Sequence, residues 1–205
     1  MAAFMPEPEQ ACRPHAIMRA LIIEHAEPKQ ACIKTGRTMT EEQLEQQEWD
    51  IVRNYLVGAT KAQRHIFAAR ANYDGNSEAF RWLVDSSETD QATALLLYWN
   101  LGAAWHVQFD SAEASSSPTT YQLLRLLEQR YKAGFYETAS IYFDPHRGSG
   151  ARPGDYPDIP VKLAIPDIML RPVEGSEHVA IEGDPEGFDE GLPFDIAETI
   201  YALYR

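Results

Sequence analysis

The sequence contains few cysteines and no long hydrophobic run. Cys12 and Cys32 are the only cysteines in a chain of 205 residues, which excludes a disulfide framework and favours two reduced thiols. No stretch of about 18 consecutive apolar residues is present, so a transmembrane helix is not expected. The first residues, Met-Ala-Ala-Phe-Met-Pro-Glu, lack the basic region of a secretory signal. We therefore expect a cytoplasmic protein.

The short signatures of common enzyme classes are also missing. The sequence has no Gly-x-Ser-x-Gly turn, no glycine-rich phosphate loop before a helix, and no pair of histidines four residues apart. Two weaker combinations remain, because Asp144 precedes His146 and His178 lies four residues before Glu182. They support the alternative of a small enzyme or metal protein that uses His146 or His178 with nearby carboxylates. The main prediction is a protein that is not an enzyme, with no metal site and no cofactor.

Basic residues are scarce. The chain has 18 Lys and Arg against 31 Asp and Glu, a formal net charge of −13 at pH 7. Proteins that bind nucleic acid use Lys and Arg to displace phosphate counterions, and anionic membranes attract the same side chains. We therefore expect neither nucleic acid nor a membrane as a partner. A basic protein fits better, because long-range attraction would speed its approach.

The negative charge is concentrated near the C-terminus. Residues 155–205 contain twelve Asp or Glu and three Lys or Arg, and residues 174–198 contain nine Asp or Glu and no Lys or Arg. Such a segment can simply form a solvated face that keeps a protein soluble. Hydrophobic residues interrupt it, however, and a polar rim around an apolar centre is typical of protein interfaces. We predict that it binds a partner through Glu174, Glu177, Glu182, Asp184, Glu186, Phe188, Asp189 and Glu190.

One apolar segment, residues 90–102, stands out in the middle of the chain. Asp90 is a good helix N-cap, and Gly102 suits the left-handed position that follows a helix. The residues between them, Gln-Ala-Thr-Ala-Leu-Leu-Leu-Tyr-Trp-Asn-Leu, leave no continuous polar face. A helix that is apolar on all sides is buried on all sides. We therefore predict a central, buried helix.

Hydrophobic periodicity places further elements on both sides of this helix. The other expected helices are residues 13–25, 40–58, 60 to the turn at 72–76, 78–84, 121–133 and 194–204. Within them we expect Lys61, Arg64 and Arg70 to face solvent, and Ile196, Ile200, Leu203 and Tyr204 to face the core. The expected strands are residues 138–143, 161–165, 168–173 and 178–181.

These elements predict an α+β fold. An N-terminal helical domain would surround the central helix at 90–101, and a small, mainly antiparallel sheet and a C-terminal helix would follow. We divide the chain into an N-terminal extension with one helix (1–37), a helical core domain (38–136), and an acidic β-rich region with the closing helix (137–205). The last two could form one compact domain.

The middle of the chain also carries a family resemblance. The segment His65-Ile-Phe-Ala-Ala-Arg-Ala-Asn-Tyr-Asp-Gly75 is followed by Trp82 and by the helix that runs through Thr93-Ala-Leu to Trp99. This turn and helix resemble the bacterial family called domain of unknown function 4274, over about residues 60–145. The tripeptide Ala68-Ala-Arg70 departs from the family's more frequent Ala-x-Asn. The family has no established catalytic residues, so none can be transferred to this chain.

The resemblance implies a function in protein binding, because members of that family often occur in bacterial toxin–immunity loci. With the acidic segment, it predicts an immunity protein that binds and neutralises a cognate toxin. The toxin would be basic, for example a nuclease-like domain of a type VI secretion effector, and would bind the acidic C-terminal surface. Both occlusion of the toxin's active site and blocked toxin assembly fit this prediction. A scaffold or regulatory module without a toxin is a further alternative.

Overall fold

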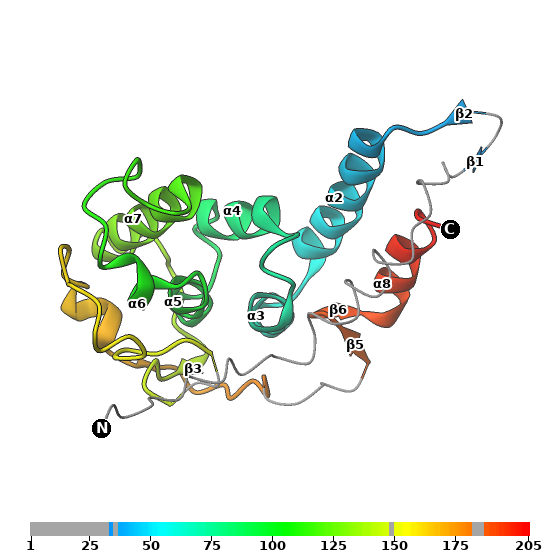
Figure 1. Ribbon diagram of the computed structural model, residues 1–205. Helices are drawn as coiled ribbons and strands as arrows, with labels where there is room; N and C mark the ends of the chain where they lie inside the picture. Colours follow the sequence, from blue (N-terminus) through cyan, green and yellow to red (C-terminus); the bar gives the residue numbers. More distant parts are fainter. Residues whose placement is uncertain (1–32, 35–36, 148–149, 182–186) are drawn as a thin grey trace, which may run out of the picture. The chain divides into compact units, whose positions relative to one another are not determined.

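The computed structural model describes residues 33–34, 37–147, 150–181 and 187–205. The chain divides into two units, residues 1–40 and residues 41–205. In the first unit, β1 (Ile33–Lys34) pairs antiparallel with β2 (Arg37–Thr38). The helix predicted over residues 13–25 and both cysteines lie outside the described residues. All other described helices and strands belong to residues 41–205 (Figure 1).

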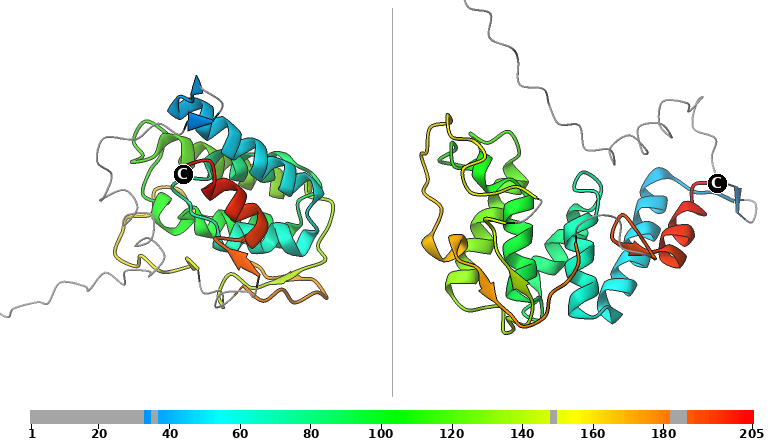
Figure 2. Two further views of the ribbon diagram at one scale, coloured as in Figure 1. Left: turned by 90° about the vertical axis from the view of Figure 1, so that its right-hand side faces the viewer. Right: turned by 90° about the horizontal axis from the view of Figure 1, so that it is seen from below.

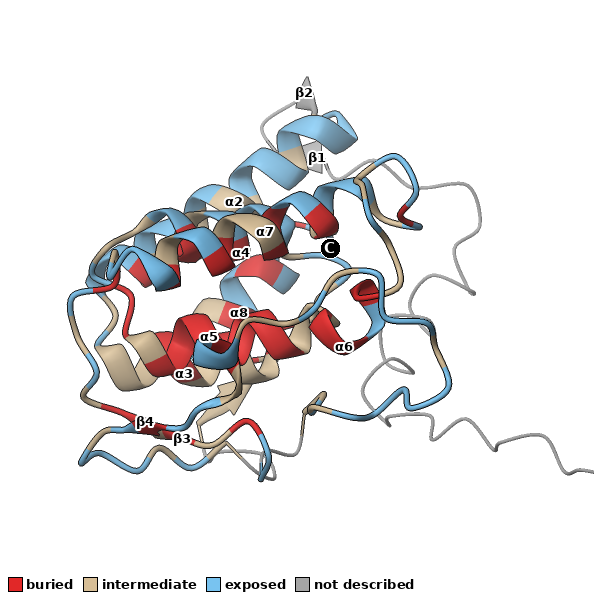
Figure 3. Ribbon diagram, turned by 90° about the vertical axis from the view of Figure 1, so that its left-hand side faces the viewer, coloured by how far each residue is buried: buried red, intermediate tan, exposed pale blue. Residues whose placement is uncertain are grey.

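The predicted central helix is confirmed as α5 (Gln91–Asn100). The Asp90 carboxylate accepts a hydrogen bond of 3.0 Å from the backbone N–H of Ala92 and so caps the first turn. Gly102 ends the helix at φ 84°, the left-handed conformation that glycine adopts without strain. All eight residues from Ala92 to Trp99 are buried, as the colouring of Figure 3 shows. The helix is therefore the centre of the hydrophobic core.

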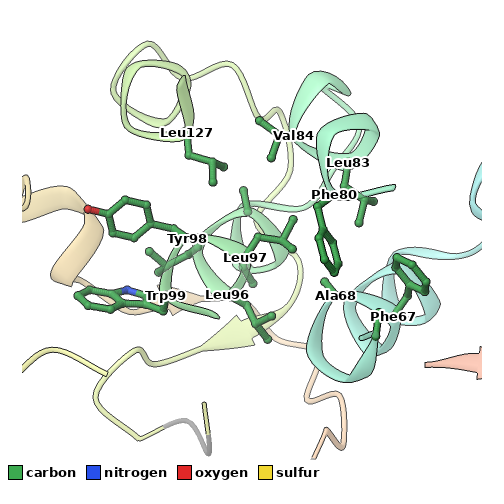
Figure 4. Close-up of a cluster of buried hydrophobic side chains, with 14 of the residues drawn as sticks. Phe67, Ala68, Phe80, Leu83, Val84, Leu96, Leu97, Tyr98, Trp99 and Leu127 are labelled. Atoms are coloured by element: carbon green, nitrogen blue, oxygen red, sulfur yellow. The ribbon is translucent and has the colours of Figure 1, made fainter. Parts of the chain in front are cut away.

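Three longer helices and one short helix surround α5. They are α3 (Lys61–Arg70), α4 (Ser77–Asp85), α7 (Pro118–Lys132) and α6 (Ala103–His106). Each of the four contacts α5 directly. Figure 4 shows Leu97 and Leu96 of α5 lying among Phe80, Ala68 and Leu127 from the neighbouring helices. This packing buries the apolar side chains whose spacing predicted the helices.

The first and the last helix in the sequence of this unit pack against each other. They are α2 (Glu41–Gly58) and α8 (Phe194–Tyr201). Both views in Figure 2 show them side by side. Val52 and Leu56 are the buried residues of α2, so most of this helix lies at the surface, as Figure 3 also shows. None of the helices in the described part of the chain is long and apolar enough to cross a membrane.

The strands are short, and the fold class is α+β as predicted. β3 (Tyr142–Phe143) pairs antiparallel with β4 (Val173–Glu174), and β5 (Phe188–Asp189) pairs antiparallel with β6 (Leu192–Pro193). The predicted strand at 138–143 is therefore reduced to its last residues. The single small sheet that we expected is, within residues 41–205 as described, two separate two-stranded pairs.

Three other strand predictions are wrong, and two of these failures have an identifiable reason. Residues 161–165 and 178–181 form no strand, and half of 168–173 lies in a 3₁₀ helix, η1 (Asp167–Leu170). Proline lacks the N–H that a strand ladder requires, and Pro160, Pro166 and Pro172 punctuate this stretch. The segment packs against the core without forming a strand there. Met169 is fully buried, and its carbonyl oxygen accepts a 3.1 Å hydrogen bond from the indole of Trp99.

Arg64 was predicted to face solvent, and this prediction is also wrong. The residue is only 8% exposed. Its Nε donates to the Leu56 carbonyl at 2.9 Å, and its Nη2 donates to the Val57 carbonyl at 3.3 Å. These carbonyls end α2, where no intrahelical donor is available. A buried arginine of α3 therefore supplies hydrogen bonds to the unpaired carbonyl groups at the C-terminal end of α2.

Candidate functional site

The predicted partner-binding residues fall into two described groups and one undescribed group. Glu174 and Glu177 are exposed beside β3, where Glu174 pairs with Tyr142 in the β3–β4 register. The backbone N–H of Glu177 donates to the Ser140 carbonyl at 2.9 Å, which fixes this loop next to the core. Three further predicted residues lie outside the described residues: Glu182, Asp184 and Glu186.

The second described group lies in the turn between β5 and β6. Phe188, Asp189 and Glu190 are each half-buried. Glu190 and Gly191 have φ values of 45° and 79°, and positive φ at both central residues is the geometry of a type I′ hairpin turn. A Cβ at Gly191 would lie 2.8 Å from the Cα of Phe67. The hairpin therefore sits directly against α3, which fixes the position of the carboxylates beside it.

Carboxylates from β5 and α2 are joined to the end of α8 and to the residues that follow it through tyrosine hydroxyls. The Tyr201 hydroxyl donates to Asp189 at 2.7 Å, and the Tyr204 hydroxyl donates to Glu48 of α2 at 2.6 Å. Burial, and then the negative charge of Asp195, raise the pKa of Tyr55 in α2 to about 12. These contacts bring together acidic residues that lie far apart in the sequence.

The sequence interpretation missed the contribution of α2. This helix contains five Asp or Glu and a single Arg, and with residues 187–205 the total is nine Asp or Glu against Arg53 and Arg205. The signal was present in the composition of residues 41–58, but only the fold shows that they pack against α8. We call this region the acidic α2–α8 surface; its carboxylates are Glu41, Glu42, Glu45, Glu48, Asp50, Asp189, Glu190, Asp195 and Glu198.

Aromatic rings are exposed on the same surface. Phe194, Tyr201 and Tyr204 are 56%, 39% and 53% exposed. The expectation that Tyr204 faces the core is wrong, because α8 ends at Tyr201 and the Tyr204 side chain reaches Glu48 instead. Ile200 and Leu203 are buried as predicted. Aromatic residues are enriched in the centres of protein interfaces, so these rings are candidates for direct contact with a partner.

The two histidines named in the alternative hypothesis, His146 and His178, contact different residues. The Nε2 atom of His146 lies 3.0 Å from the Leu170 carbonyl oxygen, and the ring of His178 lies 5.0 Å from that of Tyr142. Among the residues that the structure describes, no group of three His, Cys, Asp or Glu side chains could hold a metal ion. Glu182, which this hypothesis also invoked, lies outside the described residues.

Other polar side chains are buried in the core and hold its elements together. The Nδ1 atom of His65 lies 3.0 Å from the Thr93 hydroxyl, and burial lowers the pKa of His65 to about 4 although Asp90 opposes this shift. The Ser115 hydroxyl lies 3.2 Å from Nδ1 of His106, whose pKa is also lowered by burial and by Arg125. Because both imidazoles are buried, they serve packing rather than contact with a partner.

The Asn72–Gly75 turn and the capped α5 helix occupy the positions on which the family resemblance was based. Residues 59–132 match the family model described as a domain of unknown function, DUF4274. The DUF4274 match runs from just before α3 to the end of α7 and therefore covers the core around α5. It includes neither α2 nor α8. No curated protein and no solved structure matches the chain.

Proposed function

We propose that this protein is a bacterial immunity protein that binds and neutralises a cognate toxin through the acidic α2–α8 surface. One observation carries the proposal: exposed rings on and beside α8 lie next to carboxylates contributed by β5 and α2. Rings of this kind supply the apolar centre of an interface, and the carboxylates form its charged rim. The toxin would be basic, such as a nuclease-like domain of a type VI secretion effector.

The charge of the surface determines what kind of partner it favours. A rim of one sign raises the association rate of an oppositely charged protein by one to three orders of magnitude at low salt. The same rim repels acidic proteins and so contributes to specificity. Inhibition would follow from occlusion of the toxin's active site or from blocked assembly of the toxin.

The test is direct binding between the purified chain and the product of the adjacent toxin gene. We expect a nanomolar dissociation constant and an association rate that falls steeply with salt. Replacing Glu42, Glu45, Asp195 and Glu198 by lysine should slow association strongly at low salt, because these four exposed carboxylates belong to the acidic α2–α8 surface. Absence of nanomolar binding to that toxin contradicts the proposal.

A matched variant controls for net charge. Asp74, Glu78, Glu137 and Asp158 are exposed and lie outside the acidic α2–α8 surface. Replacing these four by lysine changes the net charge by the same amount and should change the association rate far less. If both quadruple variants slow association equally, the attraction is diffuse and the proposed interface is wrong.

A further inference from the structure

A second cluster of apolar side chains reaches the surface on α6 and on the loop at 150–163. The rings of Trp105 and Tyr156 meet edge to face with their centroids 5.4 Å apart, and the ring of Phe109 lies 6.5 Å from that of Trp105. Trp105, Tyr156 and Val161 are exposed. Large apolar side chains that are grouped at a surface mark interaction sites, whereas single ones need no explanation. We call Trp105, Phe109, Tyr156 and Val161 the α6 patch.

Backbone hydrogen bonds hold the loop of this patch against the end of α6. The N–H groups of Lys162 and Leu163 donate to the carbonyl oxygen of Val107 at 2.8 Å and 3.0 Å. The ammonium nitrogen of Lys162 also lies 3.7 Å from a carboxylate oxygen of Asp110. Val161, which precedes Lys162, is thereby held close to α6. Because the backbone of the patch is fixed, a partner that covers it has little chain to order.

The charge of this part of the surface is nearly balanced. Residues 103–110 and 150–163 contain three Asp and two Lys or Arg, whereas the acidic α2–α8 surface has nine Asp or Glu against two Arg. Two of the three Asp lie 3.7 Å and 3.9 Å from a basic nitrogen. A copy of the chain would therefore meet little local repulsion here. A surface that carries both signs can also be complementary to itself, as an isologous dimer interface requires.

The α6 patch and the acidic α2–α8 surface lie at opposite ends of the 41–205 unit. Figure 1 and the right-hand view of Figure 2 both place α6 and the loop at 150–163 at one end, and α2 with α8 at the other. Each chain carries a net charge of −13, so two copies repel each other at long range. They associate best where their acidic surfaces are farthest apart, and contact through the α6 patch meets this condition.

We propose that the α6 patch is the contact between two copies of this chain, related by a two-fold axis. Covering the rings and Val161 removes apolar surface from water and so favours association, and the balanced charges form the rim of the contact. The acidic α2–α8 surfaces of both copies stay open at the far ends of the dimer. The dimer does not depend on the proposed function, but with it each acidic surface would bind one toxin molecule in a two-to-two complex.

Sedimentation velocity of the full chain tests the dimer. Because small interfaces bind weakly, we expect monomers at about 1 µM and mostly dimers at about 100 µM. Raising NaCl from about 50 to about 500 mM should strengthen the dimer several-fold, since salt screens the repulsion between the chains and leaves the apolar contact intact. Toxin binding should have the opposite salt dependence. A chain that stays monomeric at the highest concentration in high salt contradicts the proposal.

Paired variants locate the contact. Tyr156→Ser/Val161→Ser removes two apolar side chains of the patch and should raise the dissociation constant of the dimer at least about tenfold, because both copies lose them. The matched control is Phe194→Ser/Val57→Ser, which removes an exposed aromatic ring and an exposed valine outside the patch. It should change the dissociation constant less than about twofold.

Thermal unfolding of both double variants separates loss of the contact from loss of the fold. All four side chains are exposed, so both variants should unfold close to the temperature of the parent chain. If Tyr156→Ser/Val161→Ser stays folded and dimerises like its control, the contact lies elsewhere and the proposal is wrong.

The dimer and the immunity function fail in different ways. A monomeric chain that binds the toxin with nanomolar affinity contradicts the dimer and leaves the immunity function in place. A dimer that does not bind the toxin supports the contact through the α6 patch and contradicts the immunity function.

Discussion

The hydroxyl of Tyr204 donates a 2.6 Å hydrogen bond to the carboxylate of Glu48, across 156 residues of sequence. The contact joins the C-terminal end of the chain to the first helix of the 41–205 unit. Neither partner lies in the DUF4274 region at 59–132. The acidic α2–α8 surface is therefore built from both sides of that region and depends on how α2 and α8 pack.

Tyr204→Phe should lower the free energy of unfolding by about 0.5–1.5 kcal/mol, because one hydrogen bond to a carboxylate is lost at an exposed site. Glu48→Gln should have an effect of similar size. The measurement is urea unfolding of both single variants and the double variant. If the effects of the two substitutions simply add, Tyr204 and Glu48 are not coupled in solution.

Asp90 should be among the most sensitive polar residues of the core. Its carboxylate accepts hydrogen bonds from the Ala92 N–H at 3.0 Å, the Ser140 N–H at 2.8 Å and the Ser140 hydroxyl at 2.7 Å. Asp90→Ala removes the cap of α5 and leaves buried donors unpaired, so we expect a loss of about 3 kcal/mol. Ser140→Ala, which removes one donor, should lose about 1 kcal/mol. Equal losses in urea unfolding would contradict this ranking.

The buried His65 should make stability depend on pH. Its pKa in the folded state is about 4, below the ordinary value of 6.5, so the unfolded chain binds a proton that the folded chain excludes. The stability is fully present above pH 6.5 and is lost progressively as pH falls toward 4, by at most about 3 kcal/mol. His106, whose pKa is also lowered, acts in the same direction.

The measurement is the free energy of unfolding between pH 7 and pH 5, above the range in which most carboxylates titrate. The variant His65→Asn cannot take up the proton, so its stability should change less over this range. An unchanged slope in the variant would show that His65 is not the group responsible.

The β5–β6 turn should show opposite effects at adjacent residues. Glu190 adopts φ 45°, where Asn is less strained than Glu, so Glu190→Asn should raise stability by about 0.5 kcal/mol. Gly191→Ala should destabilise by more than about 1 kcal/mol, because its Cβ would meet the Phe67 backbone at 2.8 Å. Thermal unfolding tests both.

Local signals were sufficient for the longer described helices and insufficient for the rest. The cap at Asp90, the glycine at 102 and the apolar run between them determine α5, so the sequence predicted this helix correctly. The strands failed because each described strand has two residues, too few for any alternation to show. The prediction for Arg64 failed because its acceptors are carbonyls at the end of α2, which the turn between α2 and α3 brings near the guanidinium.

The candidate surface, too, could be predicted from the sequence only in part. The acidic run at 174–198 is visible in the composition, and Asp189 and Glu190 do lie beside the last helix. The five carboxylates of α2 were not assigned to the same surface, because they are more than 120 residues away in the sequence. Contacts such as Tyr204 to Glu48 follow from the packing of two distant helices, and local periodicity carries no information about them.

The most direct test concerns α2, whose carboxylates the composition alone did not assign to the acidic α2–α8 surface. The association rate of the adjacent gene's toxin should be measured by stopped flow at low and high salt, with the Glu45→Lys/Glu48→Lys double variant. We predict about tenfold slower association at low salt and a much smaller difference at high salt. The control is Asp74→Lys/Glu78→Lys, which has the same net charge. Identical association rates for these two variants would contradict the assignment of the acidic α2–α8 surface as the binding site.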